Sequence, residues 1–161
     1  MESYLNTLVV LETERLTIRK FIRDDLPALH AIMEKEEVMY AWEHGFAKKE
    51  TRKWLGGQLK RYRKDGCGYY AVVLKETGTL IGQAGLLKNE IEGKEFVELD
   101  YIFDNSYWKR GYCMESVKAC MGFACEELKL KELYCLIRPE NEASIRIAEK
   151  TGMKKTGEHT K

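Results

Sequence analysis

The chain has 161 residues, of which 44% are hydrophobic and 33% charged, and its formal net charge is +1. This balance predicts one globular domain over residues 1–161 and excludes strong bulk attraction to nucleic acid or to an anionic membrane. The five cysteines lack the paired spacing of a metal site, and no run approaches the roughly 20 apolar residues of a membrane span. We therefore expect a cytoplasmic protein that needs no metal.

The first third of the chain predicts two strands and two helices. Residues 8–12 and 16–21 read as extended segments, the second with side chains that alternate in polarity. Asp24 is the expected N-cap of a helix with Pro27 in its first turn. After an irregular stretch over residues 34–46, a second helix is expected over 48–64. Its pair Gly56-Gly57 is costly inside a helix and predicts a kink or close packing.

The middle of the chain predicts three antiparallel strands, over residues 69–75, 79–87 and 95–103, because the links between them are short. Gly82 and Gly85 interrupt the second strand and indicate a bulge or a close backbone neighbour. A helix is expected over 113–128, and an apolar strand over 132–137 would return parallel to residues 95–103. Asn141 would cap a last helix that ends near Lys150, and residues 153–161 could begin one more strand.

The joint between the third of these strands and the next helix predicts an anion site. The strand ends near Phe103, and the basic loop Lys109-Arg110-Gly111 leads into the helix. A helix N-terminus offers unpaired N–H groups and the positive end of the helix dipole, and a glycine lets the backbone approach a bulky anion. Phosphate groups therefore bind readily at such a joint, although an ordinary strand–turn–helix connection with a solvated basic corner has the same sequence pattern.

The segment YWKRGYCMES resembles the pyrophosphate loop of the GCN5-related N-acetyltransferases, the GNAT family. That loop reads Gln/Arg-x-x-Gly-x-Gly/Ala, and here Trp108, Gly111 and Cys113 hold its first, fourth and sixth positions. Trp in first place is similar to the ribosomal-protein N-terminal acetyltransferase branch, RimJ/RimL-like, while Cys113 departs from the pattern. LETERLTIRKF and ENEASIRIAEKTGM match the same family in the same order.

The resemblance implies an α+β GNAT fold: a mixed, mostly antiparallel sheet with a central βαβ cofactor unit, helices on both faces, and C-terminal strands that are short or missing here. It also implies acetyl-CoA (coenzyme A) as the cofactor. The main chain of Tyr101, Ile102 and Phe103 would then contact pantetheine. The residues expected at pyrophosphate and its neighbourhood are Trp108, Lys109, Arg110, Gly111, Tyr112, Cys113 and Met114, with Asn141 and Ser144 at the last helix.

Acetyl transfer to an amine requires a neutral nucleophile, so a carboxylate near the acceptor is expected to act as base. Glu98 is the leading candidate by resemblance to the family, and Asp100, on the same side of the strand, is the second. The family often uses a Tyr to protonate the CoA thiolate at the position that is Ala148 here. Ser144 matches the NxxS pattern of the RimJ/RimL-like branch and is the alternative donor, although a serine in a first helical turn often only binds backbone.

The acceptor site of the family lies between the first two helices, which points to Glu37 and Trp42, with Glu43 and His44 nearby. The expected function is acetyl transfer to a protein N-terminal α-amine or a small amine by direct attack. Alternatives are a polyamine or aminoglycoside acetyltransferase, or an acyl-CoA-binding protein without turnover. The expected partner is the amine acceptor, with neither nucleic acid nor membrane bound directly. An unpaired sheet edge would favour a homodimer.

Overall fold

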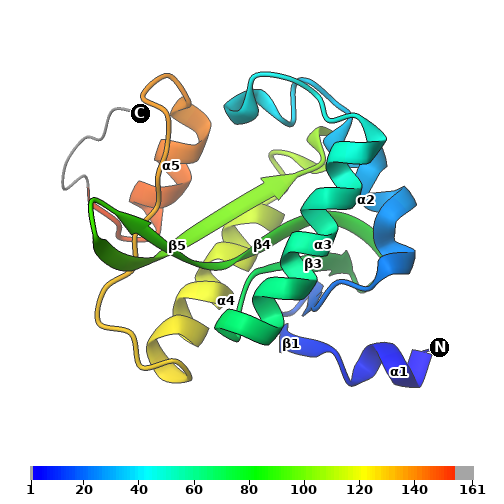
Figure 1. The fold of residues 1–161 in the computed structure, drawn as a ribbon, viewed down its shortest axis with the longest axis horizontal. Coiled ribbons are helices and arrows are strands. Elements are labelled where there is room, and N and C mark those ends of the chain that lie inside the picture. The colour runs from blue at the N-terminus through cyan, green and yellow to red at the C-terminus, as the bar shows by residue number, and fades with distance from the viewer. Residues whose placement is uncertain (1, 155–161) are drawn as a thin grey trace.

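The computed structural model describes residues 2–154, which form a five-stranded antiparallel sheet flanked by helices (Figure 1). The strands lie in chain order: β1 (Val9–Glu12), β2 (Leu16–Arg19), β3 (Tyr69–Leu74), β4 (Thr79–Ile91) and β5 (Lys94–Phe103). The helices are α1 (Glu2–Asn6), α2 (Leu26–Met33), α3 (Lys48–Asp65), α4 (Tyr112–Glu126) and α5 (Glu142–Lys150). Short 3-10 turns are η1 (Arg23–Asp25), η2 (Tyr40–Trp42) and η3 (Asn105–Tyr107). The α+β architecture expected from the sequence is confirmed.

Helices cover both faces of the sheet, as expected (Figure 1). On one face, α2 and α3 bury Leu29, Met33 and Leu55 against Tyr69 and Ile102. On the opposite face, α4 buries its own apolar stripe against β2, β4 and β5. That stripe consists of Val117, Cys120 and Ala124. Successive side chains of a strand point to opposite faces of the sheet. Each side chain of β5 therefore packs either against α2 and α3 or against α4.

The glycines of β4 allow the strands to approach closely. A Cβ at Gly85 would lie 2.0 Å from the carbonyl oxygen of Gly68, and one at Gly82 would lie 2.6 Å from the Phe103 ring. The register of β3 against β4 shifts between Val72 and Val73. Both the bulge and the close neighbour predicted for these glycines are therefore present.

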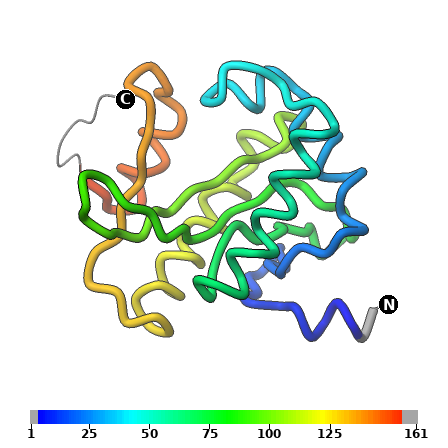
Figure 2. The backbone as a smooth tube through the Cα atoms, in the orientation of Figure 1, coloured from blue at the N-terminus to red at the C-terminus, as the bar shows by residue number. Residues whose placement is uncertain are grey.

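One edge of the sheet is left open beside the last part of β5. The segment 131–141, which connects α4 to α5, runs past this edge in Figure 2. It pairs with β5 only at Tyr134, whose N–H donates to the Val97 carbonyl at 3.0 Å and whose carbonyl accepts from the Leu99 N–H at 2.6 Å. The pairing is parallel, as predicted, but the expected strand over 132–137 is wrong, because the chain turns away from β5 after this single bridge.

Two further local predictions need correction, and a third lies mostly outside the described residues. Asp24 does not cap α2, because η1 intervenes and the N-cap residue Asp25 instead binds Arg19 and the Ile22 N–H. The glycine pair at 56 and 57 is not closely packed, because a Cβ at either position would meet nothing within 4 Å, and α3 continues through the pair as one helix of 18 residues. The strand suggested over 153–161 falls mostly on residues 155–161, which lie outside the described residues.

Candidate active site

A large pocket lies between the open edge of β5, the segment 131–141 and α5 on one side and η2 and α3 on the other. It is lined by every residue predicted for the site except Arg110. The loop before α4, the β5 strand and the start of α5 are far apart in sequence but meet here. Glu43 and His44, named as neighbours of the acceptor region, do not line the pocket.

The loop before α4 has the geometry that an anion site requires. Gly111 has φ +83°, a left-handed conformation that favours glycine, and α4 begins at the next residue. No side chain caps the helix, and within residues 2–154 no hydrogen bond uses the N–H groups of Tyr112, Cys113 or Met114. These three N–H groups at the positive end of the helix dipole fit a pyrophosphate group.

The open edge of β5 shows which main-chain groups face the pocket. The Leu99 N–H points outward to Tyr134, and the period of two in a strand puts the main chain of Tyr101 and Phe103 on the same edge. The Tyr101 N–H donates to Asp100 Oδ1 at 2.8 Å, and the Phe103 carbonyl accepts from the indole N–H of Trp108 at 2.9 Å. By the same period of two, the main chain of Ile102 faces β4, where it pairs with Gln83, and its side chain lines the pocket. Its main-chain contact with pantetheine stays a prediction.

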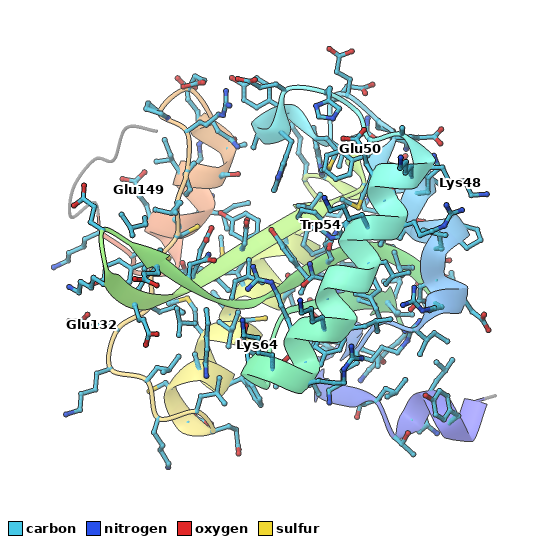
Figure 3. All side chains as sticks on the ribbon, in the orientation of Figure 1. Lys48, Glu50, Trp54, Lys64, Glu132 and Glu149 are labelled. Carbon is cyan, nitrogen blue, oxygen red and sulfur yellow. The ribbon has the colours of Figure 1, made fainter. Side chains whose placement is uncertain are left out.

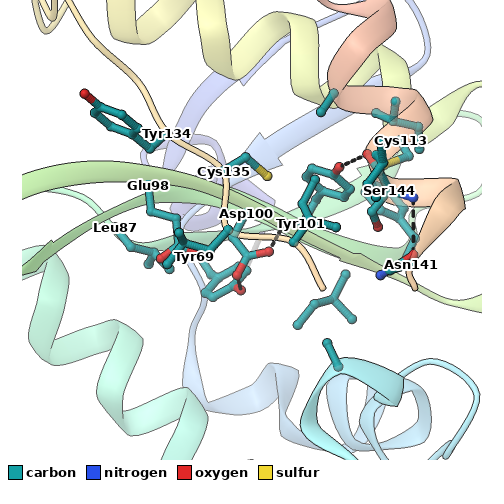
Figure 4. Close-up of a pocket in the computed structure, with 18 of the residues that line it drawn as sticks. Tyr69, Leu87, Glu98, Asp100, Tyr101, Cys113, Tyr134, Cys135, Asn141 and Ser144 are labelled. Carbon is teal, nitrogen blue, oxygen red and sulfur yellow. Dashed lines mark hydrogen bonds between the residues drawn. The ribbon is translucent and has the colours of Figure 1, made fainter. Parts of the chain in front are cut away.

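Two carboxyl groups of β5, Glu98 and Asp100, enter the pocket from the face covered by α3 (Figure 4). Glu98 is 7% exposed, and its Oε1 accepts a 2.6 Å hydrogen bond from Asn89 Nδ2. Asp100 Oδ2 accepts a 2.5 Å hydrogen bond from the phenol of Tyr69. The shared side predicted for the two carboxyl groups is therefore present, and Tyr69 is a partner that the sequence did not indicate.

Burial raises the pKa of the Asp100 carboxyl from 3.8 to about 6. Hydrogen bonds from Tyr69, from the Tyr101 N–H and from Glu98 favour the charged form and so act in the opposite direction, but they do not cancel the cost of burial. A carboxyl group with this pKa exchanges its proton close to neutral pH. Such a group is suited to take a proton from an amine and release it to solvent.

The start of α5 brings Asn141 and Ser144 to the other side of the pocket. The Ser144 N–H donates to Asn141 Oδ1 at 3.3 Å, so the predicted cap is confirmed. The phenol of Tyr101 donates to the Ser144 carbonyl at 3.0 Å and thus connects β5 with α5, as Figure 4 shows. Position 148 is an alanine, so it supplies no phenol to the pocket that it lines. Tyr101 is expected from the sequence to contribute only main chain, and strand periodicity does not predict the hydrogen bond from its side chain to α5.

Two cysteines also line the pocket, Cys113 on α4 and Cys135 just after the bridge to β5. Burial, with the nearby charges of Asp100 and Glu98, raises the pKa of the Cys135 thiol to about 12. Burial likewise raises the pKa of Cys113. Both groups are neutral thiols at physiological pH and therefore poor nucleophiles. This chemistry favours direct attack by an amine over transfer through an acetylated cysteine.

The wall opposite α5 is aromatic. Trp42 at the end of η2 packs edge-on against Trp54 at a centroid distance of 5.6 Å, and Trp54 in turn lies 5.0 Å from the ring of Tyr69. Figure 3 shows Trp54 and Glu50 in the first turns of α3. The predicted acceptor residues Glu37 and Trp42 both line this wall. Aromatic faces beside carboxylates form an environment that suits a cationic amine.

An ion pair joins the two walls. Arg138 Nη2 in the segment before α5 lies 2.9 Å from Glu43 Oε1, directly after η2. The neighbouring His44 instead pairs with Glu50 Oε2 at 2.8 Å, and hydrogen bonding to Glu50 raises the pKa of its imidazole. Glu43 and His44 thus stabilise the position of the η2 segment without lining the pocket.

Within residues 2–154, no helix is both long and apolar enough to cross a membrane. Among the same residues, no group of three or more His, Cys, Asp or Glu side chains is arranged to hold a metal ion.

Comparisons with known proteins find relatives over nearly the whole chain. A family model described as an acetyltransferase (GNAT) domain matches residues 15–154. The Bacillus subtilis protein YkkB is 29% identical over 150 residues, which cover 92% of this chain and 87% of YkkB. The crystal structure of a GNAT-family acetyltransferase from Bacillus anthracis has a TM-score of 0.78 and 28% identity, covering 91% of this chain and 84% of that one.

The fold is also that of RimL, a ribosomal L7/L12 alpha-N-protein acetyltransferase solved in complex with coenzyme A. The TM-score is 0.73 at 20% identity, with 89% of this chain and 82% of RimL covered. At that identity the likeness concerns the fold, and it agrees with the RimJ/RimL-like resemblance of the loop over residues 107–115.

Proposed function

The chain belongs to the acetyltransferase (GNAT) family and is therefore an acyltransferase that moves an acetyl group from acetyl-CoA to an amine, and we propose that its acceptor is a protein N-terminal α-amine. The family assignment sets aside the alternative of an acyl-CoA-binding protein without turnover. The observation that carries the proposal is the carboxyl pair of Glu98, which is 7% exposed, and Asp100, both of which line the pocket beside the open edge of β5.

The acetyl donor would lie along the open edge of β5. The N–H groups at the start of α4, with Lys109 and Gly111, would hold the pyrophosphate, and the outward main chain of Tyr101 would bind pantetheine. These groups bind and orient the donor, whose thioester supplies the acetyl group. Two edge groups already have partners in the structure: Asp100 accepts from the Tyr101 N–H, and Trp108 donates to the Phe103 carbonyl.

The carboxyl pair would take the proton of the attacking amine. A bond forms between the amine nitrogen and the acetyl carbon, the carbon–sulfur bond breaks, and the amine proton goes to the pair. Glu98 was expected to be the base and Asp100 the second choice. The pKa of Asp100, about 6, and its fixed contacts with Tyr69 and the Tyr101 N–H support Asp100 as the group that receives the proton, with Glu98 as its hydrogen-bonding neighbour.

The pKa of the amine itself favours an α-amine over a lysine-like amine as the acceptor, because the same base receives the proton from either one. An N-terminal α-ammonium group has a pKa of about 7.7 to 8.0, so moving its proton to a carboxylate with a pKa of about 6 costs roughly 2.5 kcal/mol. For a lysine-like amine with a pKa of about 10.4, the same transfer costs roughly 6 kcal/mol. The difference exceeds a factor of 100 in the population of the neutral nucleophile.

Ser144 would assist the departing thiolate. Its N–H is held by Asn141 and its carbonyl by Tyr101, so the residue has a fixed place at the pocket. A thiolate is a fair leaving group, and a weak hydroxyl donor is sufficient for it. The alternative, a polyamine or aminoglycoside acceptor, draws support from the aromatic wall of Trp42 and Trp54 and from Glu37.

The test compares three amines under one set of conditions: a peptide with a free N-terminus and no lysine, a peptide with a blocked N-terminus and one lysine, and a polyamine. The proposal expects kcat/KM for the first to exceed that for the second by at least about 100-fold. Preference for the blocked lysine peptide or for the polyamine would contradict the α-amine assignment and leave the family activity untouched.

A further inference from the structure

The LETERLTIRKF segment meets the loop before α4 through one carboxylate. Glu115, in the first turn of α4, accepts hydrogen bonds from the Thr13 hydroxyl at 2.5 Å, the Arg15 N–H at 3.0 Å and Arg15 Nε at 2.7 Å. Both of its oxygens are thus used by the turn between β1 and β2, which lies about a hundred residues earlier in the chain. Although partial burial acts to raise it, the pKa of Glu115 is lowered by these hydrogen bonds, so the group is ionised at neutral pH.

Arg15 then contacts the residues on both sides of Gly111. Its Nη1 donates to the Arg110 carbonyl at 3.0 Å, and its guanidinium lies 4.3 Å above the centre of the Tyr112 ring. Its Nη2 would be 3.2 Å from a Cβ at Gly111. The planar fork of an arginine can serve Glu115 and the loop at the same time, which a lysine cannot do.

The loop needs such support because its backbone is unusual. Lys109 has φ +64°, an uncommon conformation for a residue with a side chain, and Gly111 follows at φ +83°. Backbone of this kind persists where surrounding contacts hold it. Tyr112, Cys113 and Met114, whose N–H groups point from the helix end, come directly after these two residues. A small change in the loop would change the direction of all three donors.

We propose that Thr13, Arg15 and Glu115 form a clamp that presets the loop for pyrophosphate, with Arg15 as a positioning residue for the acetyl donor. This inference rests on the proposed binding of acetyl-CoA at the loop. A preset loop spends no binding energy on ordering itself, so the clamp is expected to act on donor affinity and not on the chemical step.

The test uses Arg15→Gln, Arg15→Lys and Glu115→Gln in the full chain. Each is expected to weaken CoA binding in calorimetry about tenfold and to raise the KM for acetyl-CoA similarly, while kcat stays within about twofold. Amide hydrogen exchange over residues 109–115 is expected to become faster without ligand, and exchange in β3 and β4 to stay unchanged. The control is Glu12→Gln, which removes an exposed 3.9 Å pair with Lys75 on the same strand region.

The possible outcomes distinguish a failure of the clamp proposal from a failure of the proposed function. If the wild-type chain neither binds CoA nor turns over acetyl-CoA, the proposed function fails. If the wild-type chain is active and the clamp variants bind CoA normally, the clamp is overturned alone. Rescue of affinity by Arg15→Lys would also overturn it, because the charge and not the fork would then matter. A fall in kcat with exchange raised throughout the chain would indicate a general structural role and contradict positioning.

Discussion

The phenol of Tyr69 donates a 2.5 Å hydrogen bond to Asp100 Oδ2, and Asp100 Oδ1 accepts from the Tyr101 N–H. Tyr69 is 2% exposed, and burial raises its pKa well above the ordinary value of tyrosine. The phenol therefore remains a donor across the physiological pH range. The orientation of the Asp100 carboxyl group is fixed by two hydrogen bonds before any acceptor arrives.

Removing the phenol should change the pH dependence of catalysis. Tyr69→Phe deletes a hydrogen bond that favours the charged form of Asp100, so the pKa of this carboxyl should rise above about 6. We expect the acidic limb of the kcat/KM profile to move to higher pH by about half a unit to one unit. Tyr70→Phe is the control, because Tyr70 faces the α4 layer. An unchanged limb in Tyr69→Phe would show that Asp100 is not the base.

The two carboxyl groups should respond differently to amide substitution. Asp100→Asn removes the group proposed to receive the proton and is expected to lower kcat/KM by about 100-fold or more near neutral pH, with loss of the acidic limb. Glu98→Gln keeps a side-chain donor next to Asp100 and should cost about tenfold or less. The opposite ranking, measured from pH 5 to 9, would assign the base to Glu98.

Asp100 should also make stability depend on pH. Its pKa is raised from 3.8 to about 6, so the folded state binds more protons than the unfolded state between these values. Stability is then lost as pH rises through the window from about 4 to 6, by roughly 1 to 3 kcal/mol. Denaturant unfolding at pH 4 and at pH 8 measures this effect. The free energy of unfolding of Asp100→Asn, relative to that of wild type, should be higher at pH 8 than at pH 4. Parallel profiles would mean that the carboxyl is not buried as described.

Substitutions of Ser144 and of its neighbour Tyr101 should have different effects on kcat and KM. Ser144→Ala should lower kcat about three- to tenfold and leave the KM for acetyl-CoA unchanged, because only the departing thiolate loses a donor. Tyr101→Phe removes the 3.0 Å bond to the Ser144 carbonyl and is expected to raise KM instead. The assignment of Ser144 would be wrong if Ser144→Ala kept full kcat, and Ser144→Thr serves as the hydroxyl-retaining control.

The ion pair between Glu43 and Arg138 should affect the KM of the amine acceptor and not the KM of acetyl-CoA. Exposed ion pairs contribute little to stability, so Arg138→Gln is expected to leave the unfolding temperature within about 2 °C of wild type. Because the pair joins the two walls of the pocket, the KM of the amine should rise about two- to fivefold, with the KM of acetyl-CoA unchanged. An equal change in both KM values would contradict this role.

The sequence predicted those features that depend on neighbours in the chain. Helix and strand order followed from periodicity, the cap at Asn141 from its residue type, and the common side of Glu98 and Asp100 from the strand period of two. The segment 132–137 was mistaken for a strand because its apolar composition reports burial. Composition does not show that this segment pairs with β5 only at Tyr134, through one isolated bridge.

Contacts between distant residues had no signal in a single sequence. Tyr69 meets Asp100 across 31 positions, and Arg15 meets Glu115 across 100. Each pair depends on strand register or on the packing of α4 against β1 and β2, which local patterns do not encode. The resemblance to the GNAT family supplied the cofactor and the loop, but it gave no role to Arg15 or Tyr69. These residues acquired their roles only from the three-dimensional arrangement.

The central claim is amine-dependent acetyl transfer by this chain, and mass spectrometry of the acceptor tests it most directly. Acetyl-CoA and a lysine-free peptide with an open N-terminus would be incubated with the wild-type chain and with Asp100→Asn, while thiol release is followed in parallel. We predict one acetyl group on the peptide α-amine, one CoA thiol released for each, and a strongly reduced rate in the variant. Thiol release without acetylated peptide, or no release by a chain that binds CoA, would contradict the account.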